Sequence, residues 1–511
     1  MLTKIFGSAV FGVEATTITV EVNVAVGVGY HLVGLPDNAI KESNYRIAAA
    51  LLNNGYKIPG KKITINMAPA DLRKEGSAYD LTLAVGILAA SGQIKSEGIE
   101  HYIIMGELSL DGSLQPIKGA LPIAFRACEE GFTKFILPEQ NAREAAVVEG
   151  IEVYGVQNIR EVIDHFDGRK PLERTLVDHQ EEFYSKLDFP EYDFVDVKGQ
   201  ESIKRCMEIA AAGGHNIILI GPPGSGKTML AKRLPSILPP MTLNEAVETT
   251  KIHSVAGRTD HSGLMVQRPF RSPHHTISDV ALVGGGTYPQ PGEISLSHNG
   301  VLFLDELPEF KRGVLEVMRQ PLEDREVTIS RAKFTVTYPS SFMLVASMNP
   351  SPGGYFNDPD APITSSPAEM QRYLGKISGP LLDRIDIHIE VTPVPFEKLS
   401  DHRRGEGSRE IRKRVTAARK IQSERFKEVK NTHYNAQMNT RQIREYCELD
   451  DASKTLLKNA MERLNLSARA YDRILKVART IADLEHTENI SGNHISEAIQ
   501  YRSLDREGWL A

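Results

Sequence analysis

The chain has 511 residues, which is long enough for three domains of ordinary size. Of these residues 41% are hydrophobic and 25% are charged, a composition typical of soluble globular proteins. This composition excludes a disordered scaffold. The formal net charge of −6 indicates no overall attraction to nucleic acid, so any such binding must come from a local basic patch or from a pore lined by a few basic residues.

Residues 1–168 are predicted to form an α/β domain, because β-type runs alternate with helical patterns. The β-type runs cover 17–24, 62–66 and 102–105, and the helical patterns cover 40–53, 81–91 and 121–130.

The longest apolar stretch, Leu81 to Ala90, is far too short to cross a bilayer, and the start of the chain lacks the pattern of a signal peptide. We therefore expect a cytoplasmic protein with no membrane contact.

Three cysteines, Cys128, Cys206 and Cys447, are far apart in the sequence. This spacing predicts neither a disulfide framework nor a metal-binding knuckle, and we expect these residues to be core or surface thiols.

A charged segment that is poor in periodic apolar residues, 169–190, is predicted to be a linker. It is followed by a predicted nucleotide-binding domain, 191–395, and by a helical, arginine-rich region, 396–511. The stretch 401–430 in the latter carries eleven Lys and Arg against five Asp and Glu. This charge pattern favours a solvated amphipathic helix, with contact to nucleic acid as the alternative.

A short apolar strand, 217–220, leads directly into a sequence of the form GxxxxGK[ST]. Its glycines let successive backbone N–H groups face phosphate oxygens, the lysine adds a charge toward the β- and γ-phosphates, and the threonine hydroxyl can bind Mg²⁺. A chance match is the alternative. The predicted ATP-binding residues are Gly221, Pro222, Pro223, Gly224, Ser225, Gly226, Lys227 and Thr228.

A second apolar strand, 301–304, ends in a pair of carboxylates, and this pair argues against a chance match. We expect Asp305 to hold Mg²⁺ together with Thr228, and Glu306 to polarise the water that attacks the γ-phosphate. The two motifs together predict an ATPase that uses ATP and Mg²⁺.

Three further residues have the chemistry to act during hydrolysis. Asn349 follows an apolar run, 342–346, and can orient the attacking water, while Arg384 and Arg469 can neutralise charge on the γ-phosphate. The alternative for Arg384 is an ion pair with the neighbouring Asp383 or Asp386, and the alternative for Arg469 is a solvated helix face.

Four further motifs accompany the phosphate loop: 197–200 before the first helix, Ser347-Met-Asn349-Pro after the strand that ends near 346, 377–388 around Arg384, and Ser467-Ala-Arg469-Ala near the end of the chain. With these motifs the nucleotide-binding region resembles the AAA+ ATPases, specifically the magnesium-chelatase-like branch and its ComM/YifB family, in which the last three motifs are sensor 1, the arginine-finger segment and sensor 2. The resemblance covers the whole chain. It implies an N-terminal Lon-protease-like domain, an ATPase core and a C-terminal helical lid, and it implies a ring, most simply a hexamer, in which Arg384 reaches the nucleotide of a neighbouring subunit.

Two insertions indicate a pore. The segment 244–300 resembles the helix-2 insert of magnesium chelatases and MCM-type helicases, and 325–338 is predicted to form a β-hairpin with a basic turn. Arg331 and Lys333 at this turn are our candidates for DNA contact, since a ring of such turns suits a phosphate backbone. A solvated hairpin turn is the alternative. His274 and His275 have no third ligand nearby in the sequence, which favours a structural or substrate-binding role over a metal site.

The chain departs in two places from the pattern of the family that it resembles. Many relatives carry two Cys-x-Cys pairs after sensor 1, and the corresponding positions here are Ser351, Gly353, Ile363 and Ser365, so that no thiolate remains for a metal. In the Lon-like domain, the positions of the serine nucleophile and lysine base fall on Ala78 and Leu121, while Ser77 and Lys118 are out of place. The resemblance therefore implies a domain without proteolytic activity.

The leading hypothesis is an ATP-driven hexameric motor on branched or single-stranded DNA, a helicase or branch-migration factor in recombination or natural transformation. Two rivals remain. One is a chelatase-type motor that remodels a protein partner, although the resemblance associates such motors with chains lacking a Lon-like domain. The other is an ATP-dependent protease, against which Ala78 and Leu121 argue.

Overall fold

The computed structural model describes residues 1–177, 192–259, 263–286, 289–331, 334–352, 366–394, 405–429 and 432–502. The chain divides into two compact units. The first comprises 1–187 with 242–266 and 289–291, and the second comprises 188–241, 267–288 and 292–511.

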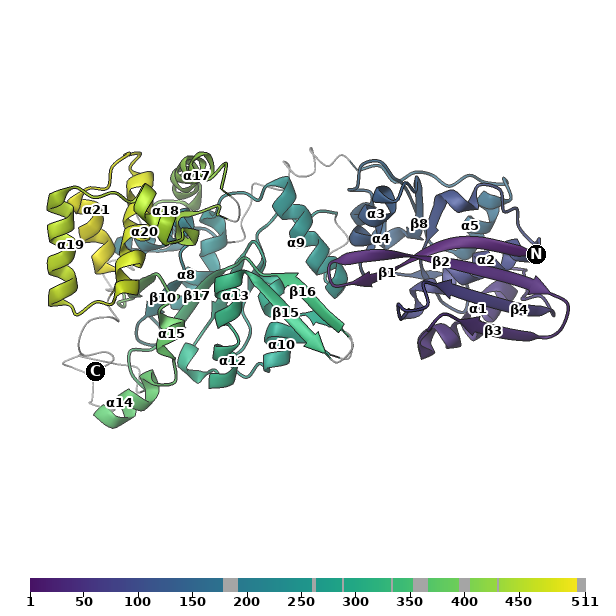
Figure 1. The fold of residues 1–511 in the computed structure, drawn as a ribbon, viewed down its shortest axis with the longest axis horizontal. Coiled ribbons are helices and arrows are strands. Elements are labelled where there is room, and N and C mark those ends of the chain that lie inside the picture. Colours follow the sequence, from purple (N-terminus) through teal and green to yellow (C-terminus); the bar gives the residue numbers. More distant parts are fainter. Residues whose placement is uncertain are drawn as a thin grey trace. The chain divides into compact units, whose positions relative to one another are not determined.

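A seven-stranded sheet with the order β3-β4-β2-β1-β5-β8-β9 forms the centre of the first unit. β1 and β2 are long antiparallel neighbours (Figure 1), and alternate residues of β2 are buried, as expected for a strand with one face on the core. Its strands are β1 (Leu2–Phe11), β2 (Glu14–Ala25), β3 (Gly29–Val33), β4 (Lys62–Ala68), β5 (Tyr102–Ile104), β8 (Lys134–Pro138) and β9 (Glu152–Val156), with β6 (Glu107–Leu108) and β7 (Leu114–Gln115) as a separate ribbon.

The helices of the first unit confirm the predicted α/β class. The strongly apolar run begins at Asp80 as α2 and is buried along its whole length against β1 and β2. The buried Asp80 carboxylate accepts two hydrogen bonds from Arg46, at 2.6 and 2.9 Å, so its charge is paired. The helices are α1 (Asn38–Asn53), α2 (Asp80–Ala90), α3 (Ala120–Glu129), α4 (Glu139–Ala145) and α5 (Ile159–Phe166), and the three predicted helical patterns correspond to α1, α2 and α3.

Two segments from the middle of the chain belong to this first unit, and they contain α9 (Leu243–Ala256) and β13 (Gln290–Pro291). α9 packs against α3, where the Lys251 ammonium lies 4.0 Å from the centre of the Phe125 ring. The Gly119 amide donates to the Ser254 carbonyl at 3.1 Å. Helix α9 therefore has its packing partner in the N-terminal sheet domain, although its sequence follows the phosphate loop.

The second unit is built on a five-stranded sheet with the order β11-β14-β17-β10-β18, in which every pair is parallel. Two of its strands, β10 and β14, are wholly apolar and buried, as expected when helices cover both faces. The strands are β10 (Ile217–Ile220), β11 (Phe270–Arg271), β14 (Val301–Leu304), β17 (Met343–Met348) and β18 (Ile387–Glu390). A separate antiparallel hairpin, β15 (Glu326–Arg331) with β16 (Phe334–Pro339), confirms the hairpin predicted over 325–338, and β12 (Gly284–Gly285) lies in the insert.

Helices of the second unit flank this sheet and form the predicted C-terminal helical region, whose helices gather together in Figure 1. α7 joins the sheet to the C-terminal helices, because it packs against β18 and also against α17 and α20. The helices are α7 (Glu201–Gly213), α8 (Lys227–Arg233), α10 (Asp279–Val283), α11 (Glu293–Leu296), α12 (Arg312–Glu316), α13 (Arg319–Asp324), α14 (Pro367–Leu374), α15 (Gly379–Leu382), α17 (Ser408–Arg425), α18 (Thr440–Tyr446), α19 (Asp451–Arg463), α20 (Ala468–Leu484) and α21 (Gly492–Gln500).

Candidate ATP site

Three neighbouring parallel strands of the second unit end at the same edge of the sheet, which we call the carboxyl edge. The phosphate loop, 221–228, follows β10, Asp305 and Glu306 follow β14, and Asn349 follows β17. The carboxyl ends of parallel strands are where α/β sheets bind ligands. The fold thus brings together residues that are far apart in the chain.

The backbone of the phosphate loop has the shape that phosphate binding requires. Gly224 and Gly226 have φ of 78° and 91°, a region that favours glycine, and helix α8 begins at the next residue with its amides directed into the loop. The buried Ser225 hydroxyl has no hydrogen-bond partner among the residues that the structure describes. A Cβ at Gly221 would lie 2.2 Å from the Val391 carbonyl oxygen, so the first glycine is required by close packing.

Lys227 holds its ammonium inside this loop. Its Nζ donates to the carbonyls of Gly221 and Pro222 at 2.6 and 2.9 Å and to Asn349 Oδ1 at 3.2 Å. Burial lowers the pKa of Lys227, and the neighbouring Asp305 and Glu306 carboxylates oppose this shift. A partly desolvated ammonium that donates to neutral oxygens fits a triphosphate, whose charged oxygens would replace these weaker acceptors.

The predicted magnesium ligands lie together. The Thr228 hydroxyl donates to Asp305 Oδ2 at 2.7 Å, and the Ser347 hydroxyl donates to the other oxygen of Asp305. A hydroxyl and a carboxylate are hard oxygen ligands of the kind that Mg²⁺ binds alongside phosphate oxygens. These residues therefore fit an ATP–Mg²⁺ complex, whose hydrolysis would supply free energy for the work of the protein.

Glu306 has an unusual backbone conformation and a neighbour that the sequence does not indicate. Its φ of 55° is rare for a residue with a side chain, and its amide donates to the Ser347 hydroxyl at 3.2 Å. His275 Nδ1 lies 3.5 Å from Glu306 Oε2. Strand order is the signal that could have found this pair, because His275 comes four residues after β11, which pairs with β14.

Gln200 is a further residue at the site, which the sequence indicates only as the last residue of the motif 197–200. Its side-chain amide donates to the carbonyls of Ser225 and Thr392, at 3.1 and 3.2 Å, and so links the phosphate loop to the segment after β18. Its φ of 57° places it in the left-handed region just before α7.

The two predicted arginines lie at the opposite side of the sheet, which we call the amino edge. Arg384 precedes β18, and its carbonyl accepts a hydrogen bond from the Asn216 side chain, just before β10, at 2.9 Å. Arg469, at the start of α20, contacts Asp383. Because β10 has four residues, about 13 Å of strand separates this edge from the phosphate loop of the same chain.

Arg384 does not form the ion pair with Asp383 or Asp386 that was the alternative to its role as an arginine finger. Its guanidinium contacts the Glu323 carboxylate and the Pro380 carbonyl, whereas Asp383 contacts Arg469 and Asp386 contacts Arg473. Glu323 is 60% exposed, so this pair is held by a solvated partner. Such exposed pairs contribute little stability and exchange readily for another anion.

Comparison with known proteins identifies the family of this chain. Family models match 193–399 (Magnesium chelatase, subunit ChlI), 20–141 (Subunit ChlI of Mg-chelatase) and 405–502 (Magnesium chelatase, subunit ChlI C-terminal). The protein YifB of Salmonella typhimurium is 44% identical over 500 residues, which is 98% of this chain and 96% of that protein. The competence protein ComM of Haemophilus influenzae is 44% identical over 509 residues, 99% and 98% of the two chains. The chain belongs to the ComM/YifB family.

Membership of the ComM/YifB family places the protein among the magnesium-chelatase-like AAA+ ATPases and confirms the predicted resemblance. A magnesium-chelatase 67 kDa subunit from Heliobacterium mobile is more distant, with 29% identity over 187 residues, 31% of this chain and 28% of that protein. No helix in the described part of the chain is long and apolar enough to span a membrane.

The structure describes only part of the basic hairpin turn and of the loop in which many relatives carry Cys-x-Cys pairs. Lys333, and the positions Gly353, Ile363 and Ser365 of the Cys-x-Cys pairs, lie outside the described residues, as does the side chain of Arg331. His274 Nδ1 lies 2.9 Å from the Thr276 hydroxyl. Among the described residues, no group of three His, Cys, Asp or Glu side chains is arranged to hold a metal ion.

In the first unit, the residues singled out for a Ser–Lys dyad have other contacts. The Ser77 hydroxyl donates to the Glu107 carboxylate. The amide of Leu121 donates to Glu144 Oε1 at 3.1 Å, and the carbonyl of Ala78 accepts from the Gly106 amide at 2.7 Å. Ala78 and Leu121 have apolar side chains, and the Ser77 hydroxyl is bound to a carboxylate, so these residues do not form a Ser–Lys pair.

Proposed function

We propose that this protein is an ATP-driven ring motor that acts on DNA, as a hexameric helicase or branch-migration factor in recombination or natural transformation. The observation that carries this proposal is the 44% identity to a competence protein over 99% of the chain, in a chain whose phosphate loop, Asp305 and Glu306 meet at one edge of a parallel sheet. In this proposal ATP and Mg²⁺ bind at 221–228 with Asp305, and DNA is the substrate. The protein would work in the cytoplasm.

The positions of the arginines support the proposed ring. Arg384 and Arg469 are at the amino edge, a strand length away from their own phosphate loop, so neither can neutralise the γ-phosphate there without a large rearrangement. A second copy that presents its carboxyl edge to this amino edge would receive both charges. Head-to-tail contacts of this kind generate a ring when the rotation between copies closes.

Within such a site each residue has a separate task. Lys227 binds the β- and γ-phosphates, Glu306 takes up the proton of the attacking water, and Asn349 orients that water from the end of β17. Arg384 and Arg469 of the adjoining copy stabilise negative charge that develops as the bond breaks.

The decisive experiment is to measure ATP turnover by the purified protein with forked DNA, four-way-junction DNA and no DNA. We expect branched DNA to stimulate turnover and to be unwound or migrated in an ATP-dependent manner. If the protein neither binds these DNAs nor responds to them, the DNA motor is excluded.

A second candidate is a chelatase-type motor that remodels a protein partner, and the match of three magnesium-chelatase family models to this chain favours it. One of these models covers 20–141, within the N-terminal unit, so the partner that stimulates ATP turnover distinguishes the two candidates. Under this alternative, a protein partner and not DNA would stimulate ATP turnover.

Substitution of Ser77 tests the remaining rival, an ATP-dependent protease. We expect Ser77→Ala to leave ATP turnover and DNA unwinding unchanged, because the Ser77 hydroxyl is bound to Glu107 and not to a lysine. Degradation of an unfolded protein such as casein is measured with ATP present, and we expect none from the wild type. Degradation by the wild type that disappears in Ser77→Ala would establish the protease instead.

The double substitution Arg331→Ala, Lys333→Ala tests the hairpin turn. We expect weaker DNA binding and unwinding with basal ATP turnover retained, because the β15–β16 turn is proposed to bind the strand. The slope of log affinity against log salt should fall by about one unit for each phosphate that an engaged subunit no longer neutralises. DNA affinity is measured by fluorescence anisotropy at several salt concentrations.

Lys454→Ala with Lys458→Ala is the matched control, since both lysines are exposed on α19 and removing them changes the net charge equally. A salt slope that falls by the same amount in both double variants would assign the effect to overall charge and not to the hairpin.

A further inference from the structure

Both arginines at the amino edge are paired with carboxylates that solvent reaches. Arg384 lies in the segment 383–386 just before β18, and its partner Glu323 is 60% exposed. Arg469 lies in the first turn of α20, where it is 71% exposed and its partner Asp383 is 31% exposed. Ion pairs of this kind contribute little stability and are easily replaced. The two pairs can therefore open when a phosphate of an adjoining copy is presented to them.

Asp386, two residues after Arg384, is buried and joins the segment 383–386 to α20. It is 2% exposed, and its Oδ2 accepts a hydrogen bond from His215 Nδ1 at 3.0 Å. Its Oδ1 lies 2.8 Å from Arg473 Nη1, an ion pair without hydrogen-bond geometry. Burial raises the pKa of the Asp386 carboxyl, but Arg473 and then His215 outweigh this effect and hold the pKa below its usual range. Asp386 is therefore a buried carboxylate that is ionised and paired.

The partners of this segment form one stripe along α20. Arg469, Arg473 and Thr480 follow one another at intervals of four and seven residues, which places them on the same face of the helix. Arg469 contacts Asp383 at one end of the stripe, and Arg473 makes the buried ion pair in the middle. At the other end the Thr480 hydroxyl is hydrogen-bonded to His215 Nε2 at 2.8 Å. The helix that carries Arg469 is thus attached to the segment that carries the other arginine at successive turns.

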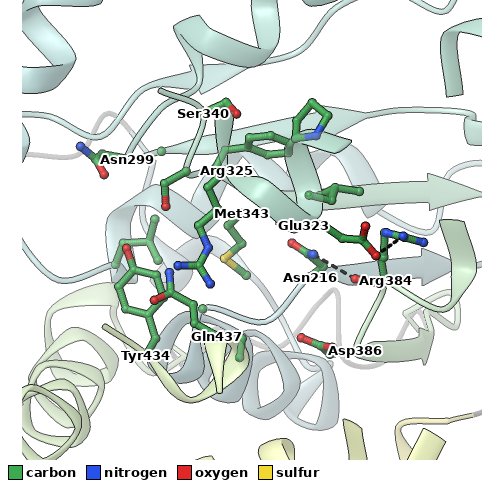
Figure 2. Close-up of a pocket in the computed structure, with 18 of the residues that line it drawn as sticks. Asn216, Asn299, Glu323, Arg325, Ser340, Met343, Arg384, Asp386, Tyr434 and Gln437 are labelled. Carbon is green, nitrogen blue, oxygen red and sulfur yellow. Dashed lines mark hydrogen bonds and ion pairs between the residues drawn. The ribbon is translucent and has the colours of Figure 1, made fainter. Parts of the chain in front are cut away.

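The backbone of the same segment is held from the start of β10. The Asn216 carbonyl accepts hydrogen bonds from the amides of Asp386 and Ile387 at 3.0 and 3.1 Å. The Asn216 side chain donates to the Arg384 carbonyl at 2.9 Å (Figure 2). Figure 2 also shows that the Arg384 side chain extends toward Glu323, while Asp386 lies apart from it. Asp386 therefore fixes the segment without occupying the guanidinium of Arg384.

We propose that Asp386 is a positioning residue for ATP hydrolysis, which holds Arg384 and Arg469 in one fixed arrangement for the nucleotide of an adjoining copy. This inference rests on the ring proposed above and names the group that aligns its two arginines. When the exposed pairs open, the buried pair of Asp386 with Arg473 stays, because breaking it would leave an unpaired charge in the interior. Such alignment matters, since a misplacement of about 1 Å can lower a rate about 10²-fold.

The first test is Asp386→Asn in the full-length protein, which keeps the shape of the side chain and removes its charge. We expect turnover at saturating ATP to fall by about tenfold or more, because the arginines are no longer held in place. The ATP affinity should stay at the wild-type value, since the arginines act only as the transition state forms. Turnover is measured as a function of ATP concentration without DNA, so the result does not depend on the DNA motor.

Glu208→Gln is the matched control. Glu208 is a carboxylate of α7, 4% exposed, that contacts Arg205 and also Arg414 on α17, so it too attaches a C-terminal helix to the rest of the unit. Each substitution removes one buried negative charge, and we expect both to lower the melting temperature, but only Asp386→Asn to lower turnover. Arg473→Gln breaks the Asp386 pair from α20 and is measured in parallel with the same expectation, so the test does not depend on the folding of one variant.

Mixing with Lys227→Ala protein separates positioning from damage to the fold. In a mixed ring, an Asp386→Asn subunit keeps its own ATP site and receives well-placed arginines from a Lys227→Ala neighbour, so turnover should return. A subunit whose own site was damaged would not be restored in this way.

The positioning role is wrong if the folded Asp386→Asn and Arg473→Gln proteins turn over ATP as the wild type does, or if their loss is not restored in mixed rings. Arg384→Ala, mixed in the same way, tests the ring itself. If turnover returns for Arg384→Ala while Asp386→Asn has no effect, only the positioning role is excluded. If turnover returns for neither inactive variant, the action of the arginines between copies is excluded as well.

Discussion

Lys227→Ala is expected to abolish tight ATP binding, whereas Glu306→Gln is expected to bind ATP normally and to stop hydrolysis. Lys227 Nζ lies among the carbonyls of the phosphate loop, where in the proposed mechanism it would bind the β- and γ-phosphates already in the ground state. Removing one charge-assisted hydrogen bond there costs about 1.5–3 kcal/mol, or roughly 10- to 150-fold in affinity. In the proposed mechanism Glu306 acts on the water and only as the transition state forms, so we expect its replacement to lower turnover by about 10²- to 10⁴-fold without a matching decrease in affinity.

The measurements are equilibrium binding of a fluorescent ATP analogue and steady-state ATP turnover. Lys232→Ala, an exposed lysine in the last turn of α8, and Glu309→Gln, a half-exposed carboxylate that contacts Lys376, are the controls and should behave as the wild type in both assays. An equal decrease in nucleotide affinity in Lys227→Ala and Glu306→Gln would contradict the two roles assigned here.

The parts of the site that could be predicted from the sequence are those in which function and local backbone shape depend on the same few residues. The glycines of 221–228 give the loop its positive φ values, and the apolar four-residue runs that precede the phosphate loop and Asp305 are strands because buried parallel strands favour such composition. The convergence of Thr228, Asp305 and Asn349 then follows from the rule that parallel strands end at one edge.

Other contacts could not be predicted because they depend on which elements pack together in three dimensions. Nothing in the pattern of 243–256 indicates that α9 packs against α3 and Phe125. The pairing of His275 with Glu306 requires β11 to lie beside β14, and the partner of Arg384 is Glu323, sixty-one residues away, instead of the adjacent aspartates.

Arg384→Ala is expected to keep the ATP affinity of the wild type and to lower turnover by about 10³-fold or more, as expected for an arginine that stabilises the transition state from an adjoining subunit. The residue lies at the amino edge, where its only carboxylate contact within the described residues is with the exposed Glu323. Its removal should therefore leave the phosphate loop and the stability of the chain nearly unchanged. Arg372→Ala, an exposed arginine on α14, is the matched control and should retain full turnover.

Mixing two inactive proteins then tests whether Arg384 acts between subunits. Lys227→Ala protein has an intact Arg384 but cannot bind ATP, and Arg384→Ala protein binds ATP but lacks the arginine. In a mixed ring, an Arg384→Ala subunit whose neighbour is Lys227→Ala would have a nucleotide and would receive a functional arginine, so some turnover should return as the two proteins are combined. The proportion of mixed rings is measured by native mass spectrometry. If rings that contain both variants form and no turnover returns, Arg384 does not act across the interface, and its contact with Glu323 would be its principal role.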